Sequence, residues 1–173
     1  MAPTSPVLND DEVFSRVEDV FDRWICGAVE SLQNSLGISL AFVIISCAIE
    51  YLAGFWKGGE TRKADYIKFL EKHLWFAAKY HPTDLYESLR NGLVHNFTIR
   101  DGKFALTSTE PHLHLKRTQD GQTILNLEDF FADFKRLKTE VFHTARTNAT
   151  ARKNFLQRHR KLGFIIYHSA IPL

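Results

Sequence analysis

The chain has few cysteines and lacks the sequence motifs of several common enzyme classes. Its 173 residues include two cysteines, Cys26 and Cys47, which make neither a disulfide framework nor a metal-binding pair. Each lies among apolar residues, so we expect both thiols to be buried, in a reducing cytoplasm. The sequence contains no phosphate-binding P-loop, no Gly-x-Gly-x-x-Gly fingerprint and no Gly-x-Ser-x-Gly elbow. We therefore expect neither a metal ion nor a cofactor.

A signal peptide and a convincing membrane span are also missing. The first residues lack the basic and apolar regions of a secretory signal, which favours a cytoplasmic location. Residues 38–56 form an apolar run long enough to cross a bilayer. Glu50 lies inside this run, where a bilayer would penalise its charge by roughly 3 kcal/mol. A central helix buried on most sides of a bundle explains the run equally well, and we expect no membrane partner.

Acidic residues are absent from the last part of the chain. Residues 1–60 carry a net charge of −6, residues 61–140 of +2 and residues 141–173 of +6. Because a basic segment attracts polyanions, we predict that the basic C-terminal helix and tail, residues 149–173, contact an RNA backbone. The alternative is an ordinary solvated helix face. The candidate RNA-binding residues are Arg152, Lys153, Arg158, Arg160 and Lys161.

The composition is that of a soluble globular protein. Hydrophobic residues make up 45% of the chain and charged residues 24%, and the length suits a single domain over residues 1–173. After a loose lead-in over residues 1–8, apolar residues recur with a helical period. Helices are predicted over residues 9–35, 38–56, 61–80, 84–95, 126–147 and 149–162. The predicted fold class is therefore all-α, a bundle of five or six helices.

The helical period is interrupted between residues 97 and 125. Asp101-Gly102 and Asp120-Gly121 are strong signals for two-residue hairpin turns. Residues 112–117 alternate between polar and apolar, as a strand would. We therefore predict a small antiparallel β insertion over residues 97–125. His112 and His114 would share one face of a strand, but no third metal ligand is evident, and we favour the interpretation that both are polar side chains exposed to solvent.

Polar side chains gather on the predicted helix that precedes this insertion, within residues 86–98. Leu85, Leu89 and Leu93 would form its buried stripe. Asn91 and His95 belong to a polar stripe on the opposite side, and the long side chain of Arg90 can turn toward it. On spacing alone, an amphipathic helix with a solvated face explains the same pattern.

The sequence Arg90-Asn91-x-x-x-His95 resembles the signature of HEPN domains, an arginine followed by a histidine after four to six residues. The order of the helices is similar too, with residues 47–52 in an earlier helix, and the resemblance covers residues 9–97 well. It implies an all-helical bundle, and many HEPN proteins are metal-independent ribonucleases that dimerise to build their site. In the toxin branch an antitoxin modifies a tyrosine two places after the histidine, and Phe97 stands there in this chain.

These residue types suit RNA cleavage without a metal ion. A histidine, with an ordinary pKa of about 6.5, can take or give a proton near neutral pH. We expect His95 to act as the acid or base, Arg90 to stabilise the phosphorane and Asn91 to orient the imidazole or donate to phosphate. Glu50, a carboxylate in a mostly buried helix, calls for a partner such as Arg90 or His95. Alternatively, Glu50 lies at the bundle edge and meets water or a lysine.

The expected partners follow from the same residues. Arg90 and His95 lie about 140° apart on an ideal helix, so one helix presents them poorly to a single phosphate unless its end unwinds. We therefore predict a homodimer with two copies of the motif near its two-fold axis. RNA is the predicted substrate, and the resemblance adds an antitoxin or nucleotidyltransferase-like protein as a further partner. A non-catalytic module that binds a nucleotide, nucleic acid or protein is the alternative function.

Overall fold

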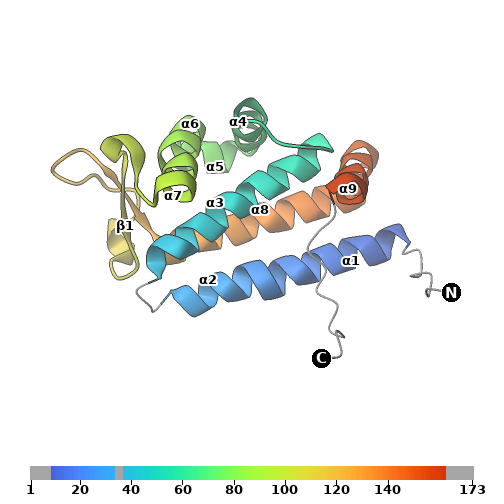
Figure 1. The fold of residues 1–173 in the computed structure, drawn as a ribbon, viewed down its shortest axis with the longest axis horizontal. Coiled ribbons are helices and arrows are strands. Elements are labelled where there is room, and N and C mark those ends of the chain that lie inside the picture. Colours follow the sequence, from blue (N-terminus) through green and yellow to red (C-terminus); the bar gives the residue numbers. More distant parts are fainter. Residues whose placement is uncertain (1–8, 34–36, 163–173) are drawn as a thin grey trace.

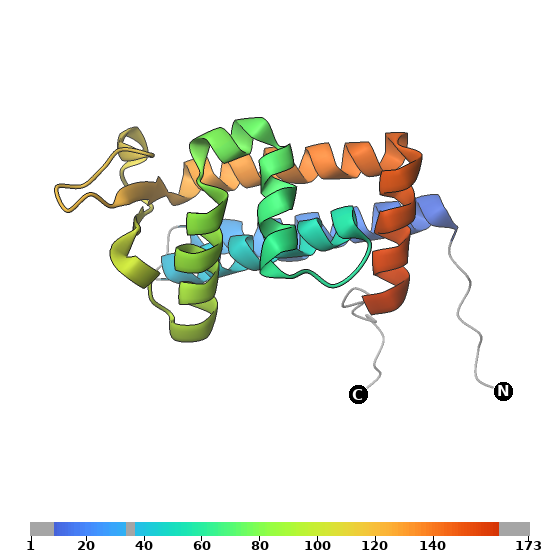
Figure 2. The ribbon, with the colours of Figure 1, turned by 90° about the horizontal axis from the view of Figure 1, so that it is seen from above.

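The computed structural model describes residues 9–33 and 37–162, and the lead-in over residues 1–8 and the tail over residues 163–173 lie outside this part. Figure 1 shows a helical bundle in which α1, α2, α3 and α8 run along the long axis. The shorter helices α4, α6, α7 and α9 cross these long helices, as Figure 2 shows from above. The prediction of an all-α fold with a small β element is confirmed.

The first helix is continuous over residues 10–32. It comprises α1 (Asp10–Val20), a π-helical stretch η1 (Phe21–Cys26) and α2 (Gly27–Leu32). Asn9 caps it, because its side chain accepts a hydrogen bond from the Glu12 amide (3.0 Å) and the Glu12 carboxylate accepts one from the Asn9 amide (2.8 Å). Both bonds satisfy amide groups that the first helical turn leaves open.

Helix α3 (Ile38–Lys57) is the central helix of the bundle and contacts α2, α4, α8 and α9. Its length and apolar composition alone would allow it to cross a membrane, but 56% of its apolar stretch is buried inside the protein. Gly58, with a φ of 82°, ends the helix. Cys26 is buried as expected, whereas the prediction for Cys47 is wrong. Cys47 is exposed because it lies on the side of α3 that faces away from the buried residues Ile45 and Ile49.

The segment predicted as one helix over residues 61–80 consists of two helices, α4 (Lys63–Lys72) and α5 (Leu74–Lys79). The helix breaks at His73, which adopts φ −93° and ψ 74°. Around this break, His73 Nδ1 (3.2 Å) and Trp75 Nε1 (2.9 Å) both contact the carboxylate of Glu140 on α8. Because of this break, the described residues form seven continuous helical runs, one more than the largest number predicted.

The insertion contains β structure, and its antiparallel arrangement is confirmed only at the second turn, where Arg117 and Thr123 form an antiparallel bridge around Asp120-Gly121. The arrangement is wrong for the two strands. Strands β1 (Phe104–Thr107) and β2 (Thr123–Asn126) are parallel, with Phe104 opposite Thr123. Asp101-Gly102 belongs to a 3-10 turn, η3 (Arg100–Gly102), and makes no hairpin. The long connection between β1 and β2 carries the chain back to the start of β1, which allows the two strands to run the same way.

The predicted strand over residues 112–117 is also absent from the structure. A 3-10 turn, η4 (Pro111–Leu113), occupies this part, and Leu115 has a φ of 63°. Pro111 fixes its own φ and lacks an amide donor, so it favours a turn over a strand. His112 and His114 therefore share no strand face. His112 is exposed, whereas His114 is half-buried against the bundle.

The final helices are α8 (Leu127–Thr147) and α9 (Ala149–Leu162). Asn126 caps α8 as its position predicts, accepting hydrogen bonds from the amides of Glu128 and Asp129. The core between α1–α2, α3, α8 and α9 contains a cluster of aromatic rings in stacked and edge-to-face contact: Phe14, Phe21, Phe55, Phe142 and Phe155.

Candidate functional site

The motif lies on a continuous helix over residues 82–96, formed by α6 (Pro82–Asp84), a π-helical stretch η2 (Leu85–Arg90) and α7 (Asn91–Asn96). The Asn91 amide donates to the Tyr86 carbonyl, five residues back, so the helix widens directly before the motif. Such π turns occur frequently at functional sites. The predicted apolar stripe of Leu85, Leu89 and Leu93 is buried, which fixes the helix against the bundle.

Arg90 is paired with Glu50 of α3. Its Nε (2.9 Å) and Nη2 (2.7 Å) both donate to the same carboxylate oxygen. The two side chains are only 18% and 20% exposed. Burial alone would lower the pKa of Arg90, but the hydrogen bonds and charge of Glu50 outweigh it and raise that pKa. This ion pair, one of the alternatives expected for Glu50, therefore holds a permanently charged guanidinium at the junction of the two helices.

Asn91 extends this contact toward the surface. Its side-chain oxygen accepts a hydrogen bond from Arg90 Nη1 (2.9 Å), and its amide nitrogen donates to Glu87 (3.3 Å). Glu87 in turn pairs with Lys63 of α4. Asn91 thus contacts the guanidinium, and no hydrogen bond joins it to His95 in the described structure. Sequence reasoning missed Glu87 and Lys63, although Glu87 lies one helical turn before Asn91.

His95 lies on the surface at the end of α7. Arg90 Nη1 contacts its Nε2 at 3.4 Å. Because a guanidinium only donates hydrogen bonds, Nε2 must be the acceptor and the proton of the neutral ring belongs on Nδ1. The large angle expected between Arg90 and His95 on the helix therefore does not keep their side chains apart. The long arginine side chain spans the angle between the two positions and brings the groups together in one chain.

Gly92, between Arg90 and His95, is a point of close approach. A Cβ atom there would overlap the carbonyl oxygen of Thr98 and would lie 2.9 Å from the backbone nitrogen of Arg100. The chain after the helix therefore folds back directly over Gly92. This contact fixes the end of α7, where His95 and Phe97 lie, and only glycine allows it.

Two predicted RNA-binding residues on α9 contact acidic residues of α1. Arg152 pairs with Asp11 (2.9 Å) and Asp10 (3.7 Å), and Arg160 pairs with Asp10 (3.4 Å). The uneven charge along the sequence is therefore partly compensated inside the molecule, because the acidic start of α1 lies beside the basic α9. This contact reduces the positive charge that α9 offers to a polyanion.

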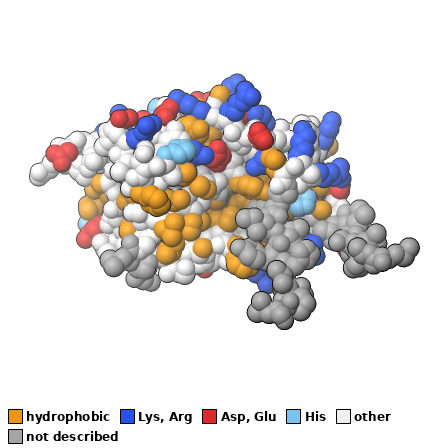
Figure 3. Space-filling view, in the orientation of Figure 1, with side chains coloured by type: hydrophobic (Ala, Val, Ile, Leu, Met, Phe, Trp, Pro, Cys, Tyr) orange, Lys and Arg blue, Asp and Glu red, His pale blue; other side chains and the backbone are white. Residues whose placement is uncertain are grey.

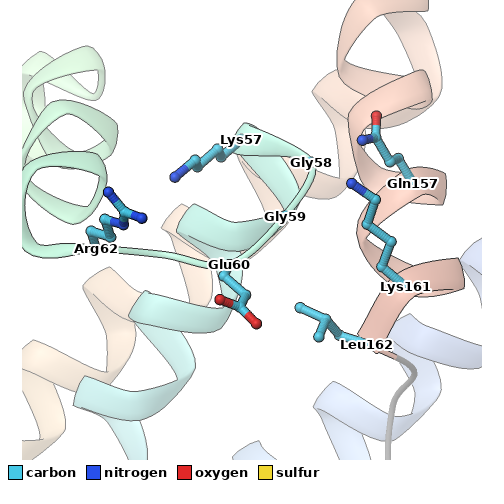
Figure 4. A pocket seen from close by; sticks show the side chains of 8 residues that line it. All are labelled: Lys57, Gly58, Gly59, Glu60, Arg62, Gln157, Lys161 and Leu162. Carbon is cyan, nitrogen blue, oxygen red and sulfur yellow. The ribbon is translucent and has the colours of Figure 1, made fainter.

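The other three basic residues of α9 differ in their surroundings. Arg158 packs over the ring of Tyr51 at 5.0 Å, with its Nε buried. Lys153 and Lys161 are exposed and form no ion pair among the described residues. Lys161 lines a surface pocket of about 510 Å³ with Lys57 and Arg62 (Figure 4).

Acidic residues offset part of the positive charge that Lys57, Arg62 and Lys161 bring to this pocket. Lys57 pairs with Asp65 at 2.5 Å, and Glu60 adds a negative charge to the pocket wall. Figure 4 shows Glu60 between Arg62 and Lys161. The predicted site residues thus form two separate groups. Arg90, Asn91, His95 and Glu50 lie together, whereas the α9 residues line surfaces near α1 and the Gly58-Gly59 turn.

A band of apolar side chains follows the outer face of α3. It comprises Leu40, Val43, Ile44, Cys47 and Tyr51, all exposed or half-buried. With 3.6 residues per turn, Val43 and Cys47 share a helix face with Glu50. Figure 3 shows hydrophobic side chains over α3 in the same orientation as Figure 1. The site thus borders an apolar surface.

No three His, Cys, Asp or Glu side chains within residues 9–33 and 37–162 lie close enough together to hold a metal ion. Comparison of the chain with protein-family models, curated proteins and solved structures gave no match.

Proposed function

We propose that this protein is a metal-independent endoribonuclease of the HEPN type, with its site at Arg90 and His95. The observation that supports this most is the contact between the guanidinium of Arg90 and the exposed imidazole of His95. A fixed cation and a titratable ring then lie at one point of the surface. These two groups can supply the base and the charge stabilisation that phosphodiester cleavage by an internal 2′-hydroxyl requires.

In the proposed reaction, the 2′-hydroxyl of RNA attacks the adjacent phosphorus and loses its proton to His95. The bond from phosphorus to the 5′-oxygen breaks, and that oxygen takes up a proton from a second acid, the protonated His95 of the partner subunit. The products are a 2′,3′-cyclic phosphate and a 5′-hydroxyl. Arg90 neutralises the charge that gathers on the non-bridging oxygens. Glu50 and Asn91 hold the guanidinium in place.

We infer that the active form is a homodimer in the cytoplasm. The apolar band on α3 supports this, because it borders the site and Leu40 in it is 45% exposed. A second copy that covers this band would bring the partner's His95 near the first site, where it can protonate the leaving oxygen. Sedimentation tests the association. Leu40→Lys should yield monomers, whereas Leu74→Lys, at a more exposed position on α5, should not.

Cleavage of labelled RNA in the presence of EDTA tests the activity itself. Purified wild-type protein should produce fragments that end in a cyclic phosphate. His95→Ala should lose this activity. His112→Ala should retain it, because His112 is an exposed histidine of the turn η4 and is not part of the motif. Cleavage that needs added metal ions, or that survives in His95→Ala, would contradict the proposed mechanism.

A second candidate function is a non-catalytic module that binds a nucleotide, nucleic acid or protein. The observation in its favour is that Glu50 and Asn91 already occupy hydrogen-bond donors on all three nitrogens of Arg90. With His95 on Nη1 as well, one of the five guanidinium N–H groups, the second on Nη2, remains for a phosphate, and a wider contact would have to displace these partners. Binding of RNA without cleavage in the same assay supports this function. Co-purification with a nucleotidyltransferase-like protein would support an antitoxin-type partner for either function.

A further inference from the structure

Phe97 has an unusual conformation directly after the motif. It ends α7 with φ 52° and ψ 30°, in the left-handed region. A side chain with a Cβ atom is disfavoured there, and glycine or asparagine is the usual residue at this helix position. The side chain is also 73% exposed. Phe97 therefore combines an unfavourable backbone conformation with an aromatic ring that stays in water.

Two backbone hydrogen bonds and the path of the following residues hold Phe97 in this conformation. The Phe97 amide donates to the Leu93 carbonyl (3.1 Å), and the Thr98 amide donates to the Gly92 carbonyl (3.2 Å). The chain must turn here so that residues 98–100 can pass over Gly92. This turn explains the backbone angle but gives no reason for an aromatic side chain. Asparagine or glycine would make the same turn with less strain.

Exposure alone does not set Phe97 apart, because Leu74 is even more exposed, at 78%. Leu74, however, begins the regular helix α5 and carries no backbone strain. What distinguishes Phe97 is the backbone strain together with its place, two residues after His95.

A cation lies close to Phe97 in the chain. Arg100 is exposed, forms no ion pair among the described residues and acts electrostatically on Glu87 of the site.

Proteins that bind single-stranded nucleic acid usually combine exposed aromatic rings with cations. Here Arg100 follows Phe97 by three residues in the chain. Bases stack on the ring, and the cations follow the phosphates. We propose that Phe97 is the stacking platform for the base next to the scissile phosphate of single-stranded RNA. This proposal deepens the proposed ribonuclease function and depends on it. Phe97 positions the substrate, while His95 and Arg90 act on the phosphate.

Substitutions at position 97 separate the ring from the backbone strain. Phe97→Gly removes the ring and relieves the left-handed conformation, so its melting temperature should equal or exceed that of the wild type. Phe97→Trp keeps a stacking surface, and Phe97→Leu keeps an apolar side chain without one. Leu74→Ala is the matched control, because it removes a similarly exposed apolar side chain from a regular helix.

The probe is a single-stranded RNA oligonucleotide that carries 2-aminopurine, a base whose fluorescence falls on stacking. Binding is measured in the His95→Ala background, so that the RNA stays intact. Adding Phe97→Gly should weaken binding about tenfold and abolish the quenching, and Phe97→Leu should behave similarly. Phe97→Trp and Leu74→Ala should bind as the parent does. The salt dependence should not change with Phe97, which carries no charge.

The outcomes distinguish this proposal from the proposed function. If the wild type cleaves RNA and Phe97→Gly binds RNA with unchanged affinity and quenching, the stacking role is wrong and the ribonuclease function stands. If Phe97→Gly converts a dimer into a monomer, the ring contacts a second copy, which also overturns the stacking role. If the parent protein neither binds nor cleaves RNA, the proposed function fails and the stacking role fails with it.

Discussion

Arg90 of η2 donates two hydrogen bonds to one carboxylate oxygen of Glu50 on α3, from Nε at 2.9 Å and Nη2 at 2.7 Å. The two residues are forty positions apart in the chain. Their pairing fixes the motif helix to the central helix of the bundle. It also satisfies a carboxylate that would otherwise be poorly solvated beside apolar residues of α3.

Removing this carboxylate should destabilise the protein. Glu50→Ala leaves the mostly buried guanidinium of Arg90 without its counter-charge, and we expect the free energy of unfolding to fall by about 2 kcal/mol. Urea denaturation measures this change. Glu71→Ala, at an exposed position on α4, is the control and should have little effect. A double-mutant cycle with Arg90→Ala should show strong coupling, and additive losses would mean that the ion pair contributes nothing.

The packing at Gly92 makes a second prediction. Gly92→Ala places a methyl group against the backbone of Thr98 and Arg100, which cannot move as a flexible side chain can. We expect a loss of about 2–3 kcal/mol in unfolding free energy. Gly59→Ala is the matched control, because a Cβ there meets nothing within 4 Å. Equal melting temperatures for the two variants would show that residues 98–100 do not pass over Gly92.

A third prediction concerns pH and His114, which joins the insertion to the bundle. His114 Nδ1 accepts a hydrogen bond from the Asn126 amide (3.1 Å), so the neutral ring carries its proton on Nε2, 2.9 Å from the Tyr80 hydroxyl. Burial lowers the pKa of His114 below its ordinary value of 6.5, although Asp129 and Asp133 oppose this shift.

The direction of the effect follows from proton binding. Below pH 6.5, His114 binds a proton more readily in the unfolded chain than in the folded protein. The neutral His114 therefore contributes fully to the stability of the fold above that pH. This contribution is lost as the pH falls from 6.5 through the lowered pKa. Unfolding free energies at pH 7.5 and 5.5 measure the loss. His114→Gln should show a smaller difference between the two pH values than the wild type, and an identical difference would contradict the assignment.

The basic residues of α9 that pair with α1 and those that are exposed without an ion pair in the described structure should respond differently to substitution. Arg152→Gln breaks contacts with Asp10 and Asp11 and should cost about 0.5–1 kcal/mol of stability, since the pairs lie at the surface. Lys153→Gln should leave stability unchanged. If α9 contacts RNA, Lys153→Gln combined with Lys161→Gln should weaken binding to all RNA sequences and reduce its salt dependence. An unchanged salt dependence would remove α9 from the RNA interface.

The sequence predicted the helices well because their apolar stripes repeat over many turns. The stripe of Leu85, Leu89 and Leu93 and the cap at Asn126 both depend on local spacing, which the chain itself displays. The break at His73 was not predictable in this way. It coincides with contacts to Glu140, which lies 67 residues away in the chain.

In the insertion and the site, too, features set by local spacing could be predicted, whereas features set by contacts between distant parts of the chain could not. The two Asp-Gly pairs correctly indicated where the chain turns. The relative direction of β1 and β2 could not be predicted, because it depends on how the segment between the two strands packs. The pairing of Glu50 with Arg90 could be expected because a carboxylate in an apolar helix requires a partner. The contact between Arg90 and His95 depends on side-chain length rather than helix angle, and the strain at Phe97 depends on the chain passing over Gly92. Neither is encoded in residue spacing.

The activity of His95→Ala tests the central claim most directly. The rate of RNA cleavage in EDTA is measured for the wild type and the variant, together with both melting temperatures. Because His95 is exposed, the variant should melt within a few degrees of the wild type, while its cleavage rate should fall by about 10²–10⁴-fold. Equal cleavage rates at equal melting temperatures would contradict the assignment of His95 as the acid–base group.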